Sequence, residues 1–302
     1  MASVQSYLIE WYLRLKRAFA PHHSEELDIA KERADTVAMA ASFGRFSGVE
    51  CSPVSANGVP AEWIVPVGLT AERCILYVHG GTFFAGCIES HRPLAANIAV
   101  AARARALLID YRLSPEHPYP AGLEDVITAY HWLLEKVVPG KIAIASDSAG
   151  GALTLGLLLA LRDGGEALPA CAVCLSPATD LTLEGETWQT NRKSDIMLEY
   201  WKVVKGLEIY LRETDPHTPL ASPLHADLKG LPPLLIQVGS AEMILSDSTR
   251  FAEKARTAGV DVTLEIWERM QHEWQFASSL LPEGKRAIAG IGRFIQRWIP
   301  AE

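Results

Sequence analysis

Residues 142–163 read IAIASDSAGGALTLGLLLALRD, which is an apolar strand, a tight turn of small residues and an apolar helix. Ser148 lies at the apex of that turn, with Ser146 two positions before it and Gly150 two positions after it. Small neighbours let the strand and the helix approach without a clash of side chains. A sharp strand-to-helix turn pushes a serine hydroxyl out of the fold, where a base can activate it. The stretch therefore predicts an α/β fold and makes Ser148 a candidate nucleophile.

A glycine turn upstream is the second informative feature. Residues 73–84 read RCILYVHGGTFF, a β-branched and aromatic strand that runs into His-Gly-Gly. Glycines bring bare backbone N–H groups close to a developing oxyanion, and each fixed donor lowers the barrier by about 3–4 kcal/mol. The N–H of Ala149, directly after Ser148, is a further expected donor. A simple turn at the end of the strand is the alternative, but the serine elbow downstream favours an oxyanion loop.

An acid and a histidine follow the serine in the order that a catalytic triad on this kind of sheet requires. Residues 233–239 (PLLIQVG) predict a buried strand that ends just before Glu242. Residues 262–267 (VTLEIW) alternate with period two and predict the next strand, and His272 follows on its exit loop. Open α/β sheets place their sites at the carboxyl ends of strands. We expect His272 to take the proton from Ser148, and Glu242 to fix the imidazole tautomer.

Asp247 is a second candidate for the acid, five residues after Glu242. It opens the pattern of a helix, where Ser246 can cap the first free N–H groups and an acid suits the helix dipole. Glu242 comes three residues after Gly239, where the strand ends, so its carboxylate can reach the loop that carries His272. We therefore predict Glu242 as the acid and a helix-start role for Asp247.

Three motifs in order resemble those of the hormone-sensitive-lipase-like branch of the α/β-hydrolases, also called GDXG or bacterial family IV esterases. HGGTFFAG at 79–86 is similar to the HGGG element, and SDSAGG at 146–151 to GDSAGG. YRLSPEHPYPAGLEDV at 111–126 resembles the Tyr-Arg-Leu-Ala-Pro-Glu-His-Pro-Phe-Pro-Ala stretch. The resemblance runs from about residue 61 to the C-terminus. It implies an α/β-hydrolase fold, with a mostly parallel eight-stranded sheet flanked by helices and a helical cap.

Two positions depart from the family pattern. Ser146 replaces the first glycine of the elbow, and Thr82 replaces the third glycine of HGGG. The family's oxyanion donors are usually assigned to the second and third glycines. The resemblance therefore implies that Gly81 and Thr82 donate, together with Ala149, and that Gly80 shapes the turn.

The alternation of strands and helices predicts a mostly parallel sheet covered on both faces, with antiparallel early strands at one edge. The expected strands are two within residues 48–67, then 73–78, 106–110, 141–145, 170–175, 234–238 and 262–267. Helices are expected at residues 123–137, 149–162 and 285–298.

Two helical stretches lie outside this alternation. The first carries an apolar face at three-and-four spacing, formed by Val4, Leu8, Trp11, Tyr12, Leu15 and Phe19. The second is residues 187–211, between two sheet strands. The resemblance implies that both pack as a cap over Ser148, in one catalytic domain with a cap segment 1–47, core 48–186, cap insertion 187–215 and core 216–302. A helix docked on the body and a helix on a membrane surface are the alternatives for the first stretch, whose mixed charges disfavour the membrane.

Apolar side chains on or beside these elements are the candidate lining of the substrate pocket. They are Phe83, Phe84, Met197, Tyr200, Trp201 and Trp274. Each alone is more often core than pocket. Bulky rings beside the oxyanion turn leave limited space, so we expect a small acyl group.

Composition and charge exclude several classes of protein. Among 302 residues, 49% are hydrophobic and the formal net charge is −8, which leaves no basic surface for nucleic acid or anionic membrane. No run approaches the ~18 apolar residues that span a bilayer. The charges of Glu10, Arg14, Lys16 and Arg17 interrupt any signal-peptide core. We therefore predict a cytoplasmic protein without stable membrane anchoring.

The five cysteines form no disulfide framework, since their number is odd and their spacing irregular. Cys171 and Cys174 form a CxxC, but they lie on a predicted buried strand, where residues three apart point to opposite faces. No second Cys/His pair follows with ligand spacing. We predict no metal and no cofactor, and the sequence is compatible with a homodimer.

Together these observations predict a carboxylic ester hydrolase that acts through an acyl-enzyme on small apolar esters, with acyl groups of roughly two to six carbons. The same triad would also serve a lactone or amide hydrolase. A ligand-binding pseudo-enzyme on this fold would lack a triad member, whereas Ser148, Glu242 and His272 are all present.

Overall fold

The structure is a computed structural model, which describes residues 2–18, 26–70 and 72–301. Its strands are β1 (Val49–Ala56), β2 (Val59–Pro66), β3 (Cys74–Val78), β4 (Arg105–Ile109), β5 (Ile142–Asp147), β6 (Cys171–Leu175), β7 (Leu234–Gly239) and β8 (Val262–Trp267). They form one sheet in the order β1-β2-β4-β3-β5-β6-β7-β8. β2 pairs antiparallel with both β1 and β4, and every other pair is parallel. The predicted mostly parallel, eight-stranded sheet is confirmed.

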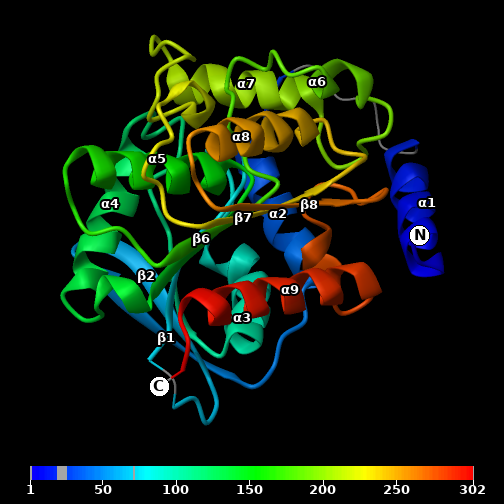
Figure 1. The fold of residues 1–302 in the computed structure, drawn as a ribbon. Coiled ribbons are helices and arrows are strands. Elements are labelled where there is room, and N and C mark those ends of the chain that lie inside the picture. Colours follow the sequence, from blue (N-terminus) through cyan, green and yellow to red (C-terminus); the bar gives the residue numbers. More distant parts are fainter. Residues whose placement is uncertain (1, 19–25, 71, 302) are drawn as a thin grey trace.

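The helices are α1 (Val4–Ala18), α2 (Ile29–Phe43), α3 (Ile88–Ala102), α4 (Ala121–Leu134), α5 (Ala149–Asp163), α6 (Thr187–Thr190), α7 (Tyr200–Leu211), α8 (Leu245–Thr257) and α9 (Pro282–Trp298). Short 3₁₀ turns occupy Pro139–Lys141, Pro223–His225 and Trp274–Ala277. Helices α3 and α9 pack on one face of the sheet, and α4, α5 and α8 on the other (Figure 1). No helix among the described residues is long and apolar enough to cross a membrane.

Burial on both faces explains the continuous apolar runs of the central strands. All five residues of β3 are buried, as are all five of β6. Successive side chains alternate between the two layers of core. Cys171 packs in the layer under α3 and α9, and Cys174 packs in the layer under α5, so the predicted opposite orientation of the two thiols is confirmed.

The sequence patterns predict neither α2 nor α3. Helix α3 is rich in small apolar residues and buries most of its surface between β2, β4 and α9, so no polar stripe marks its period. Pro93 lies inside it, which is a local signal against a helix. Tertiary burial outweighs that signal.

Helix α1 forms where the sequence predicts it, but the orientation of its apolar face differs from the expectation. The side chains of Val4, Leu8, Trp11, Tyr12 and Leu15 face solvent instead of packing on the body. Phe19, predicted on the same face, lies outside the described residues. The helix contacts the body through its other side, where Ile9 and Leu13 lie among polar residues.

Candidate active site

The elbow between β5 and α5 holds Ser148 in a backbone conformation that few side chains adopt, with φ 47° and ψ −119°. The N–H of Ser148 donates to the carbonyl of Leu175 at 2.8 Å, and its own carbonyl accepts from Gly151 and Ala178. Gly150 has no room for a side chain, because an added Cβ would collide with the carbonyls of Val78 and His79. Main-chain bonds on both sides therefore hold the strained serine at the carboxyl end of the sheet.

A continuous hydrogen-bonded chain joins the predicted nucleophile, base and acid. Ser148 Oγ lies 3.0 Å from His272 Nε2, and His272 Nδ1 lies 2.8 Å from Glu242 Oε2. These residues come from three loops, each following a different strand of the sheet. All three residues are buried. The arrangement can move a proton from the serine hydroxyl to an imidazole whose other nitrogen faces a carboxylate.

The Glu242 carboxylate is held from both sides. Its second oxygen accepts hydrogen bonds from the hydroxyl of Ser176 and from the N–H of Gly239. Burial raises the pKa of Glu242, and the hydrogen bond to His272 opposes that rise. The carboxylate is therefore oriented toward the imidazole before any ligand binds.

Asp247, the alternative acid, makes no contact with His272, and it lies in the first turn of α8 as predicted, but the predicted cap is wrong. Helix α8 begins at Leu245 after an N-cap at Ile244, so Ser246 is not the cap. The Asp247 carboxylate is fully buried, and it accepts from the backbone N–H groups of residues 179 and 180 and from the indole of Trp188. Burial raises its pKa to about 7. Asp247 thus ties the loop after β6 to the segment that carries α6.

The loop after β3 supplies backbone N–H groups to the same point. Among the described residues, the N–H groups of Gly81, Thr82 and Ala149 donate to no protein acceptor. The N–H of Gly80 instead donates to Asp147 Oδ2 at 2.8 Å. Gly81 has a φ of +114°, and Thr82 adopts a positive φ of 52°. A bound oxyanion can therefore receive the first three N–H groups, while that of Gly80 is already engaged.

Asp147 links the elbow to this loop. Besides the N–H of Gly80, its carboxylate accepts from the hydroxyl of Tyr77 at 2.6 Å and lies 3.3 Å from His91 Nε2. Burial would raise the pKa of Asp147, but His91 and these donors hold it well below the usual range. His79, also buried, bonds through Nδ1 to the carbonyl of Gly80, and burial lowers its pKa to about 3. Asp147 and His79 therefore both hold the loop after β3 in place.

Glu273 is the nearby group that the sequence patterns did not single out. Its carboxylate lies 3.6 Å from His272 Nε2, and burial together with the charge of Asp147 raises its pKa to about 8. Burial lowers the pKa of His272, but the charge of Glu273 and the bond to Glu242 outweigh that effect and raise it to about 9. The sequence did offer one signal for Glu273, since it directly follows His272, the predicted base.

A small apolar cavity opens directly from the nucleophile. Its empty space, part of which is open to solvent, is about 360 Å³, and it is lined by Ser148 together with Thr82, Phe83, Leu198, Val203, Leu207, Ile244 and Trp188, among others. Most of these side chains are hydrophobic, and two come from α7. The cavity can hold a short apolar chain attached to a carbonyl at Ser148.

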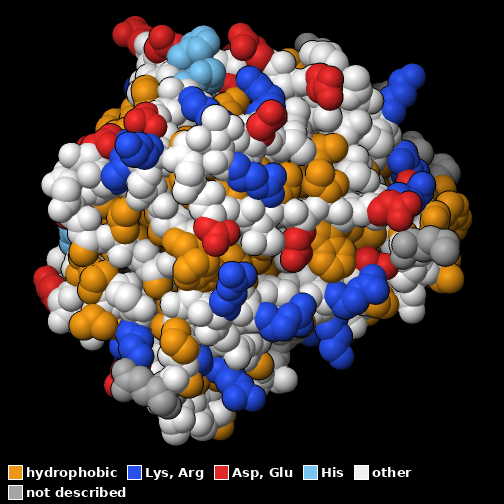
Figure 2. Space-filling view, viewed as in Figure 1, with side chains coloured by type: hydrophobic (Ala, Val, Ile, Leu, Met, Phe, Trp, Pro, Cys, Tyr) orange, Lys and Arg blue, Asp and Glu red, His pale blue; other side chains and the backbone are white. Residues whose placement is uncertain are grey.

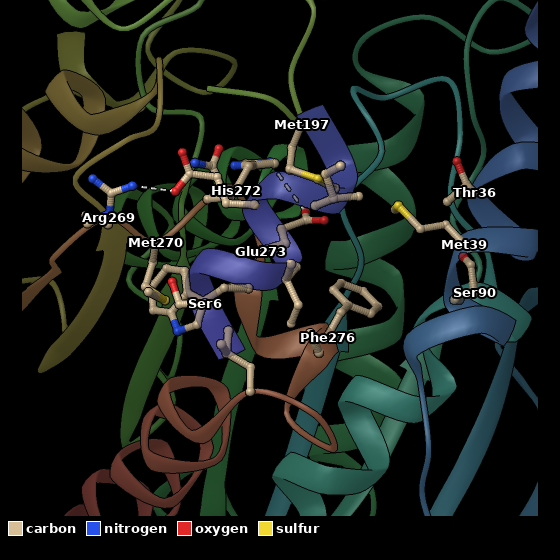
Figure 3. Close-up of a pocket in the computed structure, with 18 of the residues that line it drawn as sticks. Ser6, Thr36, Met39, Ser90, Met197, Arg269, Met270, His272, Glu273 and Phe276 are labelled. Carbon is tan, nitrogen blue, oxygen red and sulfur yellow. Dashed lines mark hydrogen bonds and ion pairs between the residues drawn. The ribbon is translucent and has the colours of Figure 1, made fainter. Parts of the chain in front are cut away.

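A larger cavity of about 840 Å³ lies on the other side of His272. Helices α1 and α2, the loop from Arg269 to Ala277 and Met197 form its walls. Figure 3 shows Met39 reaching from α2 into the space beside Glu273 and Phe276. Met39, Met197 and Met270 give this cavity adaptable walls.

The residues predicted to line the substrate pocket divide between these cavities and the surrounding core. Phe83 lines the small cavity, and Met197 and Trp274 line the large one. Phe84, Tyr200 and Trp201 line neither of the two. Tyr200 instead packs against Trp188 and the guanidinium of Arg192, and the Trp201 indole donates to Glu199. Within the described ranges, no cluster of histidine, cysteine and acidic side chains has the geometry of a metal site.

Comparison with known families and related proteins gives consistent matches. Residues 75–276 match the model of a family described as the α/β hydrolase fold. An acetyl-hydrolase of Streptomyces hygroscopicus is 41% identical over 297 residues, covering 98% of this chain and 97% of that protein. An esterase of Acinetobacter venetianus is 38% identical and covers 82% of each chain.

Solved structures match over nearly the whole chain. A crystal structure of an esterase from the bacterial hormone-sensitive lipase family is 42% identical, covers 99% of both chains and superposes with a TM-score of 0.93. The esterase EstE5, solved after soaking with p-nitrophenyl butyrate, is 38% identical and covers 99% of this chain and 100% of that chain, with a TM-score of 0.93.

Proposed function

This chain belongs to the α/β-hydrolase family and is an esterase of its bacterial hormone-sensitive-lipase-like branch, and from that premise we propose that it hydrolyses short-chain carboxylic esters through an acyl-enzyme on Ser148. The observation that carries the proposal is the hydrogen-bonded chain from Ser148 through His272 to Glu242, with distances of 3.0 and 2.8 Å. Each group is already positioned for its step without movement of the backbone.

In the first half of the reaction, Ser148 Oγ attacks the ester carbonyl while His272 Nε2 accepts the hydroxyl proton. The Glu242 carboxylate stabilises the imidazolium, which then gives the proton to the leaving alcohol oxygen as the C–O bond breaks. Water repeats the sequence, replaces the serine oxygen on the acyl carbon and releases the acid. The oxyanion of both tetrahedral intermediates receives the free N–H groups of Gly81, Thr82 and Ala149.

The small cavity supports a short acyl group. It begins at Ser148, is lined mostly by hydrophobic side chains, and spans about 360 Å³, part of it open to solvent. An acyl chain of two to six carbons fits that space with its apolar surface out of water. The leaving alcohol would then occupy the large cavity on the His272 side.

The domain organisation is part of the proposal: a cap made of residues 1–47 and 187–215 covers a core made of residues 48–186 and 216–302. Lys202 of α7 pairs with Glu32 of α2 at 2.8 Å, which joins the two cap segments. Gly206 lets α7 approach the oxyanion loop, since an added Cβ would lie 2.6 Å from Thr82 Cγ2. A closely fitted cap would exclude water from the acyl group. The cytoplasmic location and the homodimer remain predictions.

Rapid mixing of the enzyme with p-nitrophenyl butyrate tests the chemistry. We expect a burst of nitrophenol stoichiometric with enzyme whenever deacylation is the slower half-reaction. Acid quenching should trap a butyryl group on the peptide that contains Ser148, detected by its mass. An acyl adduct on any other residue would overturn the proposed nucleophile. A panel of lactones and anilides of equal size, run beside the ester, measures how strictly the site selects esters.

A further inference from the structure

The outward side of α1 carries a continuous apolar surface, which we call the outer face. Its side chains are 41–72% exposed, and they are Val4, Tyr7, Leu8, Trp11, Tyr12 and Leu15. At 3.6 residues per turn these positions fall within an arc of about 140°. Figure 2 shows apolar side chains gathered at the edge of the molecule where Figure 1 draws α1. Contiguous apolar patches of this kind on a protein surface mark interaction sites.

The opposite side of α1 already has a role in the molecule. Ser6, Ile9, Glu10 and Leu13 form part of the wall of the large cavity beside His272. Ile9 packs against the apolar cluster that contains Trp274, and Ser3, just before the helix, bonds to Glu283. The outer face is therefore not needed to pack α1 on the body, and its apolar side chains require another explanation.

We propose that the outer face of α1 docks reversibly on a zwitterionic lipid surface. Tyr7, Trp11 and Tyr12 are side chains that favour the boundary between hydrocarbon and headgroups, while Leu8 and Leu15 supply purely apolar contact. A helix with such a face lies in the plane of the interface and does not span it.

The charges beside the outer face fit phosphate groups. Arg14 and Arg269 both pair with Glu10, at 2.9 and 2.6 Å, and both guanidinium side chains remain more than 40% exposed. Two guanidinium groups on one carboxylate leave a net positive charge at the edge of the apolar surface. The net charge of the whole chain is −8, which repels an anionic membrane at long range. A phosphatidylcholine surface carries phosphate groups that the two guanidinium groups can bind. Because its net charge is zero, it does not repel the acidic chain.

The shape of α1 favours a lipid surface over a second copy of the chain. The outer face is a single convex helix at the edge of the molecule (Figure 1). A deformable lipid surface can cover such a ridge along its full length. Two rigid ridges touch mainly where they cross. The area buried at such a crossing is far below the ~1,200–2,000 Å² of a stable protein interface.

Docking would place the wall of the large cavity against the lipid. Because the inner side of α1 borders the space beside His272, an ester dissolved in the lipid would reach the site from there. This consequence rests on the proposed ester hydrolysis, whereas the docking itself does not.

Co-sedimentation of the full chain with phosphatidylcholine vesicles tests the docking. The variant carries Leu8→Glu and Trp11→Glu, and its control carries Val100→Glu and Val138→Glu, two exposed valines elsewhere on the surface. We expect the partition coefficient to fall at least ~10-fold in the α1 variant, since two apolar side chains become charged. The control should stay within about twofold of the unchanged protein. No binding by the unchanged protein, or an equal loss in both variants, would overturn the proposal.

A quenching measurement keeps the test valid if the α1 variant folds poorly. Vesicles of brominated phosphatidylcholine should quench the tryptophan fluorescence of the unchanged protein, and Trp11→Phe should remove that quenching. Quenching that persists in Trp11→Phe places another tryptophan at the lipid and contradicts the assignment. Light scattering adds a second arm: a dimer that the α1 variant splits, without vesicle binding, identifies a second copy as the occupant and overturns the lipid.

Activity separates this proposal from the proposed function. Both variants should hydrolyse p-nitrophenyl butyrate in water at the unchanged rate, because neither Leu8 nor Trp11 lines a cavity at the site. On a long-alcohol butyrate ester carried in vesicles, the α1 variant should lose about as much rate as vesicle binding. Retention of full activity on the vesicle-borne ester despite lost binding contradicts delivery through α1. Absence of activity on both esters, with binding intact, contradicts the ester hydrolysis instead.

Discussion

The two cavities beside the Ser148–His272 pair are built differently. The small one is walled by loops that leave the strands and by α7, with side chains such as Val203 and Leu207 almost fully buried. The large one is walled by α1, α2 and three methionines, and its outer wall is a helix that touches solvent on its other side. Short, sheet-anchored walls favour a fixed shape, whereas unbranched methionine side chains, one on α2 and two in loops, can adapt. The difference predicts strict selection of the acyl group and tolerance toward the alcohol.

Ser148→Ala removes the one nucleophile that both cavities would serve. If both cavities serve one nucleophile, kcat should fall at least ~10⁴-fold on esters with a large acyl group and on esters with a large alcohol alike. The fold should persist, because the main-chain bonds of the elbow do not involve the hydroxyl. Steady-state kinetics on both ester series, beside a thermal melt, measure this. Loss on one series alone would show that the cavities serve separate sites.

The second test compares two acids. Glu242 orients His272, whereas Asp247 lies in the wall of the small cavity. Glu242→Gln should lower kcat by about 10²–10⁴-fold, since the imidazole loses the carboxylate that sets its tautomer. Asp247→Asn should leave kcat nearly unchanged but cost about 1–3 kcal/mol of stability, because an amide cannot accept all three N–H donors. Kinetics and chemical denaturation separate the effects, and the reverse pattern would make Asp247 the acid.

Val203→Phe tests the fixed shape of the small cavity by filling part of it. The added ring should lower kcat/KM for butyrate and hexanoate esters by about 10–100-fold, while acetate esters lose little, since only longer chains need that volume. The measurement is kcat/KM against acyl length at a constant alcohol. A uniform loss across all lengths would mean that the acyl group lies elsewhere.

The pH dependence of kcat/KM tests the role of Glu273, an acid that lines the large cavity. Only neutral His272 accepts a proton from Ser148, so kcat/KM should rise with pH until the pH passes the pKa of His272, near 9. Glu273→Gln removes a negative charge that stabilises the imidazolium. The acid limb should therefore move to lower pH, so the rate at a fixed pH on that limb should rise. An unmoved limb would exclude Glu273 as a cause.

Ile9→Phe is the matched control for Val203→Phe on the large cavity. Ile9 lines that cavity from α1, and the helix and methionines around it can shift to accommodate a ring. We expect changes of only about two- to threefold in kcat/KM across alcohols, and none across acyl lengths. A loss as steep as that of Val203→Phe would show that both cavities are equally rigid, which contradicts the predicted tolerance toward the alcohol.

Much of the site could be predicted from local sequence because local chemistry determines it. The elbow needs small residues around one serine, and parallel strands buried on both faces need continuous apolar runs, so both leave marks within a few positions. The position of Glu242 three residues after a strand end was also a local signal. The buried contacts of Asp247 were not predicted, because its partners, Trp188 and the loop at 179–180, lie some sixty residues earlier in the chain.

Helix α1 shows a feature that the sequence alone could not determine, namely which side of a helix packs on the body. Its spacing determined that a helix forms, but large apolar residues occur on both of its sides, so periodicity could not decide which side packs. Only the tertiary structure turned Ile9 and Leu13 toward the His272 cavity and left Trp11 in solvent. It likewise divided the predicted pocket residues between two cavities and brought Glu273 to His272 Nε2. Turn chemistry and strand burial act between neighbours in the chain, whereas the packed side of a helix depends on surfaces far away in sequence.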